Sequence, residues 1–458
     1  MTSAILGLYL AVMGLFAPPQ QVTFSETVAP ILYQNCVTCH RPGEAAPFSL
    51  ISYEDAKKRG ALIATVTRSR YMPPWHAAHG FGEFKEERRL SDDQISSLAA
   101  WVAQGMPQGD PAKMPKLPAF TEGWHLGKPD LILEMPTAYD VPASGPDIYR
   151  NFVVPTNLTE DRWVRAIEFR PSARKAVHHV LIGYDASGAV RKLDGADGHP
   201  GYSATMGGSF TSTANSGSLG GWAVGNTPEL LPEEFALSLP KGSDIVLQMH
   251  FHPTGKPETE RSVIGIYFSS RPPERNLKGV ELPPLFGFGS GINIPAGKSD
   301  YTIEDSLALP VDTQAFGVFV HAHYVAREMK ATATLPDGST QPLIWIPDWD
   351  FNWQDVYTFK TLVSLPKGTR IDVRVTYDNS ADNPRNPNNP PKVVLWGEQT
   401  FDEMASINIP MVTVRKEDEQ VLQEFLSNRQ KAAIQRGIQD GTLKRMMEQR
   451  AMGERGAR

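Results

Sequence analysis

In the stretch SDIVLQMHF, residues 243–251, Ile245, Leu247, Met249 and Phe251 alternate with Val246, Gln248 and His250. The stretch GTRIDVRVTYDNS, residues 368–380, repeats this pattern, with charged or polar residues between the apolar ones. A period of two residues is typical of half-buried antiparallel strands. Both stretches therefore predict sheets with one face buried and the other face toward water.

The composition supports a β-rich chain of several domains. The 458 residues include 38 Pro and 38 Gly, and stretches such as FTSTANSGSLGG and DNSADNPRNPNNPP indicate long loops between strands. The length suggests about three domains. We expect two mainly antiparallel β-sandwiches, at residues 120–275 and 280–415. The formal net charge is -6 without an evident basic patch, which argues against nucleic acid as a partner.

The N-terminal sequence MTSAILGLYLAVMGLFAPPQQ contains one apolar run, residues 5–17. A helix that spans a membrane needs about 20 apolar residues, so this run is too short. It fits the apolar core of a secretory signal at residues 1–21, and a buried helix is the alternative. We therefore expect no spanning segment and a periplasmic or secreted protein.

The sequence NCVTCHRPG contains Cys36 and Cys39, the only cysteines of the chain, followed directly by His40. Cys-x-x-Cys-His is the attachment signature of a c-type haem. A four-cysteine zinc site is impossible here, and a thioredoxin-like redox pair needs a βαβ setting that is absent. An accidental match is the remaining alternative. The motif predicts thioether bonds to both cysteines and His40 as the proximal iron ligand.

The surrounding segment, residues 22–115, resembles small cytochromes c. Its sequence predicts helices at residues 24–35, with Ser25 as a possible cap, and at residues 52–68 and 90–105. The resemblance implies a small all-α domain with a methionine next to a proline as the sixth iron ligand. Met72 fits that description, whereas we interpret His76 and His79 as surface histidines.

Six other histidines are grouped in AVHHVLIG, IVLQMHFHPTG and FGVFVHAHYV, which indicates metal binding. His321 and His323 are two residues apart, so on a strand their rings share a face and can chelate one ion. His178 and His179 are adjacent, so one ion can reach both only through a bulge or through different ring nitrogens. His250 would complete a three-imidazole site with them.

These motifs together resemble the copper type II, ascorbate-dependent monooxygenases, which include the peptide-amidating hydroxylase and dopamine β-monooxygenase. The resemblance implies two jelly-roll-like domains with one copper ion in each. It implies that the first ion is bound by His178, His179 and His250, and the second by His321, His323 and, in TFDEMAS, Met404. A soft thioether ligand favours Cu(I), the state that reacts with O2.

The resemblance also implies an activity, namely hydroxylation of a C–H bond of a small organic substrate with O2. An open position on the second copper would permit catalysis. The electron donor would be an extracytoplasmic small reductant or redox protein, and the attached haem c would relay its electrons to the two copper ions. No catalytic residue is predicted beyond the copper ligands.

The sequence departs from that family at the substrate position. The peptide-amidating members have an arginine where Phe319 stands here, and neither Ser406 nor Asn408 supplies a positive charge. We therefore expect no peptide-acid substrate. An apolar or aromatic substrate fits Phe319 and Tyr324 better.

Several alternatives stay open at this stage. His252 lies on the same strand face as His250 and could replace it as a ligand. Zinc could fill a three-histidine site. The chief rival function is a non-enzymatic extracytoplasmic copper-binding electron-transfer protein, and a binding module with decayed copper sites is a further rival. Residues 416–458 form a charged tail in which Val421, Leu422 and Phe425 could seat one helix.

Overall fold

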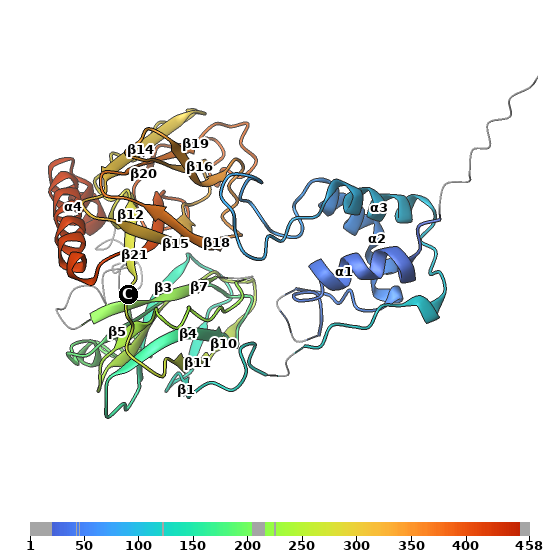
Figure 1. Ribbon diagram of the computed structural model, residues 1–458, viewed down its shortest axis with the longest axis horizontal. Coiled ribbons are helices and arrows are strands. Elements are labelled where there is room, and N and C mark those ends of the chain that lie inside the picture. Colours follow the sequence, from blue (N-terminus) through green and yellow to red (C-terminus); the bar gives the residue numbers. More distant parts are fainter. Residues whose placement is uncertain are drawn as a thin grey trace, which may run out of the picture. The chain divides into compact units, whose positions relative to one another are not determined.

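The computed structural model (Figure 1) describes residues 21–42, 44, 46–120, 123–203, 216–223 and 226–448. The signal peptide expected at residues 1–21 lies outside the described residues, apart from its last residue. The chain divides into two compact units: residues 1–73 with 88–119, and residues 74–87 with 120–458. Among the described residues, no helix combines the length and apolar character that crossing a bilayer requires.

The three helices expected in the first unit are present (Figure 1). They are η1 (Phe24–Val28) continued by α1 (Ala29–Asn35), then α2 (Tyr53–Arg68) and α3 (Asp92–Ala103). The first helix is capped by Thr23, which accepts a hydrogen bond from the amide of Glu26, and not by Ser25. Ser91 and Gln94 form a reciprocal capping box at the start of α3.

The expected fold class, an all-α cytochrome c domain followed by two jelly-roll-like β-sandwich domains, is nevertheless wrong. The chain is mainly β, with about 33% of its residues in strands, and no small all-α cytochrome domain is evident in the described part. Residues 74–87, expected inside the helical segment, belong to the β-rich unit, and both expected sandwiches fall in that same unit. Sequence periodicity predicts individual helices and strands, whereas contacts between distant segments decide how these elements assemble into domains.

The N-terminal half of the β-rich unit contains two larger antiparallel sheets and a small one. One sheet has the order β1 (Leu131–Glu134), β11 (Val263–Phe268), β4 (Arg162–Arg170), β8 (Leu237–Leu239). The other has the order β6 (Tyr202–Ser203), β3 (Ile148–Pro155), β9 (Asp244–Phe251), β5 (Val177–Asp185), β7 (Ser216–Ala223). A small pair joins β10 (Glu258–Glu260) to β2 (Tyr139–Val141). Apolar residues of the two larger sheets share one core.

The C-terminal half repeats this plan. One sheet has the order β12 (Lys278–Leu282), β21 (Ser406–Thr413), β15 (Thr313–His321), β18 (Val356–Leu365). The other has the order β14 (Tyr301–Ala308), β19 (Arg370–Tyr377), β16 (Ala326–Thr334), β17 (Thr340–Ile346), and β13 (Asn293–Ile294) pairs with β20 (Val394–Leu395). These sheets share a second core. Short helices lie at η2 (Pro111–Lys113), η3 (Val190–Lys192), η4 (Leu285–Gly287) and η5 (Lys416–Asp418).

The two stretches that predicted strands are confirmed as β9 and β19, but only β19 is half-buried as expected. All eight residues of β9 are buried. Leu247 on one face belongs to the core between the two larger sheets, and Val246 on the other face packs with Val153 and Tyr202. Both faces of β9 are therefore buried. The alternating sequence pattern predicted one exposed face, so it did not reveal the residues that pack on that face.

Residues 74–87 join the β-rich unit through main-chain hydrogen bonds and aromatic packing. The amide of Ala78 donates to the carbonyl of Trp345 over 2.7 Å. The main-chain amide of Lys85 donates to the carbonyl of Thr358, and that of Lys360 donates to the carbonyl of Glu83. Phe84 is 4% exposed and stacks on Phe359 with ring centroids 5.3 Å apart. Residues 74–87 are therefore held against the strands that contain Trp345 and Phe359.

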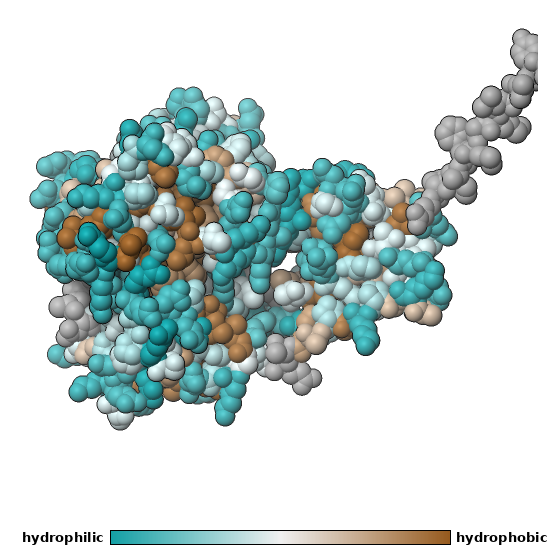
Figure 2. All heavy atoms as spheres, viewed as in Figure 1, coloured by the Kyte–Doolittle hydropathy of each residue, from teal (hydrophilic) through white to brown (hydrophobic). Residues whose placement is uncertain are grey.

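The C-terminal tail is seated by α4 (Glu419–Gln439). Leu422 is fully buried as expected, whereas Val421 is 47% exposed. Figure 2 shows hydrophobic surface over the position of α4, and Ile434 and Ile438 are exposed there. Arg429 pairs with Asp305 and fixes the helix to the body of the unit.

We predict that Phe84→Ala destabilises the β-rich unit by about 3 to 5 kcal/mol, because it removes a buried ring and leaves a cavity. Denaturant unfolding monitored by tryptophan fluorescence measures the change. Phe401→Ala is the matched control, since Phe401 is 50% exposed; it should shift stability by no more than about 0.5 kcal/mol. Equal effects of the two variants would contradict the docking of residues 74–87.

Candidate metal centre

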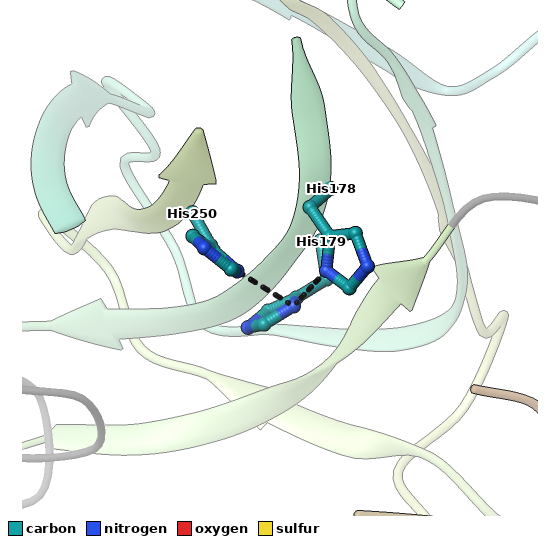
Figure 3. Close-up of side chains that lie close together, drawn as sticks. All are labelled: His178, His179 and His250. Carbon is teal, nitrogen blue, oxygen red and sulfur yellow. Dashed lines mark hydrogen bonds between the residues drawn. The ribbon is translucent and has the colours of Figure 1, made fainter. Parts of the chain in front are cut away.

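The first histidine set depends on an irregularity between β5 and β9. Val177 faces Phe251 and His179 faces His250, so one residue of β5, His178, is extra and the register shifts there. A bulge of this kind re-aims a side chain that would otherwise point to the opposite face. The adjacent pair therefore reaches one site through a bulge, one of the two ways that the sequence left open, and Figure 3 shows the three rings gathered together.

The Nδ1 atoms of the three rings converge. The distance is 3.0 Å from His178 to His179 and 3.4 Å from His250 to His179. Two nitrogens bound to one ion at about 2.0 Å in trigonal or tetrahedral geometry are roughly 3.3 to 3.5 Å apart. The spacing is thus close to that of ligands sharing one ion, and these three residues form a group that could hold a metal.

Burial keeps these imidazoles neutral. It lowers the pKa of His178 and His179 well below the usual value, and it lowers the pKa of His250 despite the neighbouring carboxylate of Asp147. A neutral imidazole has a free lone pair, which metal binding requires. His252 lies outside this group, because its side chain is 60% exposed and its Nδ1 contacts Asp147.

The second histidine set lies at the end of β15. The strand ends at His321, so His323 lies just beyond it, yet the two ring centroids are 5.2 Å apart. The Nδ1 of His321 is 2.6 Å from the side-chain oxygen of Gln354, and the Nδ1 of His323 is 3.2 Å from the carbonyl oxygen of Asp402. Each contact fixes the proton on Nδ1 and leaves Nε2 as the lone-pair nitrogen.

Both of these Nε2 atoms are buried without a hydrogen-bond partner among the described residues. Burial lowers the pKa of His321 to about 4 and that of His323 well below its usual value. Buried polar atoms normally have a partner, so two neighbouring unpartnered lone pairs suit the binding of one ion by both rings. The residues therefore fit a metal ion.

Met404 is brought to this pair by the carboxylate of the preceding residue, Glu403. One carboxylate oxygen accepts from the amides of His323 and Met404, and the other accepts from Val325 and Ala326 over 3.1 Å each. Burial raises the pKa of Glu403 to about 8, against these four donors, which lower it. Met404 itself is 1% exposed, and its amide shares one Glu403 oxygen with the amide of His323.

The two histidine sets are contiguous. The ring centroids of His179 and His321 are 5.9 Å apart. Phe351 stacks on His178 at 4.5 Å and meets the ring of His323 edge-on at 5.7 Å. The sequence predicted one ion in each of two sandwiches, and the structure places the two histidine sets next to each other, with four of the five imidazoles buried.

The Cys-x-x-Cys-His sequence lies directly after α1, where Cys36 is the C-cap. The amide of His40 donates to the carbonyl of Cys36 over 2.9 Å, so the motif forms one compact turn. The Nδ1 of His40 is 3.1 Å from the carbonyl oxygen of Phe48, which leaves Nε2 for an iron ion. Burial lowers the pKa of His40 and raises that of Cys36 to about 12. The donor set therefore fits a covalently attached haem.

The assignment of Met72 as the sixth iron ligand stays a prediction. Met72 lies in the same compact unit as His40, whereas His76 and His79 belong to the β-rich unit. His79 is exposed and contacts Glu87, as expected for a surface histidine. His76 is not a surface histidine, because it is half-buried and its Nε2 is enclosed.

Sequence reasoning missed three residues that support the histidines: Asp147, Gln354 and Glu403. Glu403 is part of the quoted TFDEMAS stretch, where only the methionine was given a role. Asp147 and Gln354 carry no local signal, since each is far in sequence from the ring it contacts. Only tertiary contacts identify them.

Comparison with known proteins gives no assignment. No family model matches the chain, and no curated protein matches it. Among solved structures, PNGF-II has a TM-score of 0.26 and 9% identity, over 62% of this chain and 65% of that chain. The cowpea mosaic virus top component has a TM-score of 0.29 and 8% identity, over 65% and 92%. A peptide-N(4)-(N-acetyl-β-D-glucosaminyl) asparagine amidase has a TM-score of 0.28 and 10% identity, over 62% and 97%. These TM-scores support no inference about this chain.

We predict that Glu403→Gln destabilises the protein by about 1 to 3 kcal/mol, because an amide group replaces one of the acceptors and leaves buried N–H groups unsatisfied. Thermal unfolding measures the change. Glu417→Gln is the matched control, since Glu417 is exposed. A Glu403→Gln protein as stable as this control would show that the four amide contacts contribute nothing.

Proposed function

We propose that this chain is a copper-dependent monooxygenase that hydroxylates a C–H bond of a small organic substrate with O2, with electrons relayed by a covalently attached haem c. The observation that carries the proposal is a set of five neutral imidazoles, four buried and His178 partly buried, whose lone-pair nitrogens have no protein partner or converge on one another. Imidazoles accept both oxidation states of copper. The resemblance of the ordered motifs to copper type II monooxygenases adds the reaction class.

The proposed ligands form two ion sites with different roles. His178, His179 and His250 would hold an ion through three nitrogens, a ligand set suited to storing one electron. His321 and His323, with Met404, would hold the other, where a thioether favours the reduced state. Bound copper would supply the one-electron chemistry that activates O2.

The protein's own groups would orient the ligands and exclude water. Gln354 and the carbonyl of Asp402 hold the His321 and His323 rings through Nδ1. Phe351 covers one ring of each set with an apolar surface. Hydroxylation incorporates one oxygen atom and releases the other as water, which consumes two electrons and two protons, so the two sites need a continuing electron supply.

The attached haem would be that supply. Cys36 and Cys39 would bind its vinyl groups as thioethers, and His40 would ligate the iron through Nε2. Covalent haem attachment and an apolar N-terminal run both suit a periplasmic or secreted location. The donor would be a small reductant or a redox protein of that compartment.

A non-enzymatic copper-binding electron-transfer protein is the second candidate. The deep burial of the histidines favours it, because His323 is fully buried and His321 is 2% exposed. An electron can reach a buried centre, whereas a substrate has to approach the reacting ion. O2 uptake that rises on addition of an organic substrate would separate the enzyme from this alternative.

We predict about two copper ions per iron in protein matured with haem and dialysed against trace copper. His179→Ala and His323→Ala should each lower the ratio to about one, because each removes a ligand of one site only. Elemental analysis gives the ratio. His252→Ala is the matched control and should retain both ions. A wild-type ratio near zero would exclude the monooxygenase.

We predict that ferrous haem is oxidised when the copper-loaded protein is mixed with O2 and that His323→Ala slows this step, because the second ion site is lost. Stopped-flow absorbance of the haem band measures the rate, with Cys36→Ser protein, which cannot attach haem through both cysteines, as the spectral control. Haem that stays reduced on the turnover timescale would disprove the relay.

A further inference from the structure

Asp147 is a carboxylate that contacts the first histidine set. It directly precedes β3, whose register places Tyr149 opposite His250 and Ile148 opposite Phe251. Its Oδ2 lies 3.2 Å from the Nε2 of His250, and its Oδ1 lies 2.8 Å from the Nδ1 of His252. The side chain of Asp147 is only 6% exposed, so this carboxylate is buried between the two rings.

Tyr149 fixes the same ring from another direction. Its ring stacks on that of His250 with centroids 4.4 Å apart and planes inclined by 13°. Asp147 and Tyr149 are two residues apart at the start of one strand, so their side chains share a face. The ring of His250 is therefore held in its plane by Tyr149 and in its rotation by Asp147.

The chemistry of a carboxylate decides which nitrogen of His250 carries the proton. The 3.2 Å contact does not have hydrogen-bond geometry, and both atoms lack a hydrogen-bond partner among the described residues. The negative charge of the carboxylate nevertheless attracts an N–H and repels a lone pair on the neighbouring Nε2, so it favours the Nε2–H form of the neutral ring. The lone pair then lies on Nδ1, which is the atom 3.4 Å from Nδ1 of His179. The opposite tautomer would direct an N–H into the cluster, where it could not bind an ion.

We propose that Asp147 is a positioning residue of the three-histidine site, which selects the Nε2–H tautomer of His250 and aims its Nδ1 at the ion. This inference rests on the proposed copper function for the identity of the ion. The tautomer of His250 is independent of that function, because it is a property of the metal-free protein. His252, on the exposed side of Asp147, has no part in binding the ion.

The first experiment measures the tautomer without any metal. Nitrogen NMR of histidine-labelled, metal-free wild-type protein should show His250 as the Nε2–H form. In Asp147→Asn the amide can donate to Nε2, so the Nδ1–H form should become populated. A wild-type protein with the proton of His250 on Nδ1 would overturn the inference, whether or not copper binds.

The second experiment measures copper affinity in a His323→Ala background, in which only the three-histidine site is complete. Competition with a chromophoric chelator should show that Asp147→Asn weakens binding about 10- to 100-fold, the usual effect of removing such a support. The Cu(II) EPR spectrum should change with it. His252→Gln is the matched control and should retain the affinity and spectrum of the background protein.

The outcomes separate this inference from the proposed function. If the background protein binds copper and Asp147→Asn binds it equally well, the positioning role fails and the copper site stands. If the background protein binds no copper, the proposed function fails, and the role of Asp147 is then tested by the NMR tautomer measurement alone. A loss of affinity in His252→Gln equal to that in Asp147→Asn would also contradict the assignment.

Discussion

The candidate centre depends on one constraint, the pairing of β5 with β9 around an extra residue. A regular ladder would send His178 and His179 to opposite faces, and one of them would lie among the apolar side chains of the core. The register shift between Val177 and His179 removes that conflict. Because β9 is covered on both faces, the ladder has little freedom to slip, and the three rings are held together before any ion binds.

Burial then determines the chemistry of the five rings. An imidazole enclosed by protein loses the solvation of its charged form, so it stays neutral and keeps a lone pair. Three of the rings also have a polar group beside the nitrogen that faces away from the cluster: Asp147 beside His250, Gln354 beside His321 and the carbonyl of Asp402 beside His323. These partners lie in segments remote from the rings they serve. Folding thus creates both the desolvation and the supports that choose the metal-facing nitrogen.

Much of the local structure could be predicted from sequence. The helix predicted at residues 90–105 is present as α3, and the strand at residues 243–251 is present as β9. For the adjacent histidines the sequence left a bulge and different ring nitrogens as alternatives, and the structure has the bulge. The fold class was mistaken where distant contacts decide the grouping. Residues 74–87 lie between two helices in sequence, yet Phe84 stacks on Phe359 of the β-rich unit. No periodicity within that segment could report this partner.

The sequence by itself determined which candidate ligand groups the chain offers: one Cys-x-x-Cys-His motif, three histidine clusters and a methionine. Their residue types and short spacings restrict the chemistry, because few side chains offer soft or imidazole ligands. Only the tertiary structure decided that the clusters meet in one buried region and which ring nitrogens face inward. The physical reason is that hydrogen-bond partners and burial arise from contacts between distant segments, which neighbouring residues do not encode.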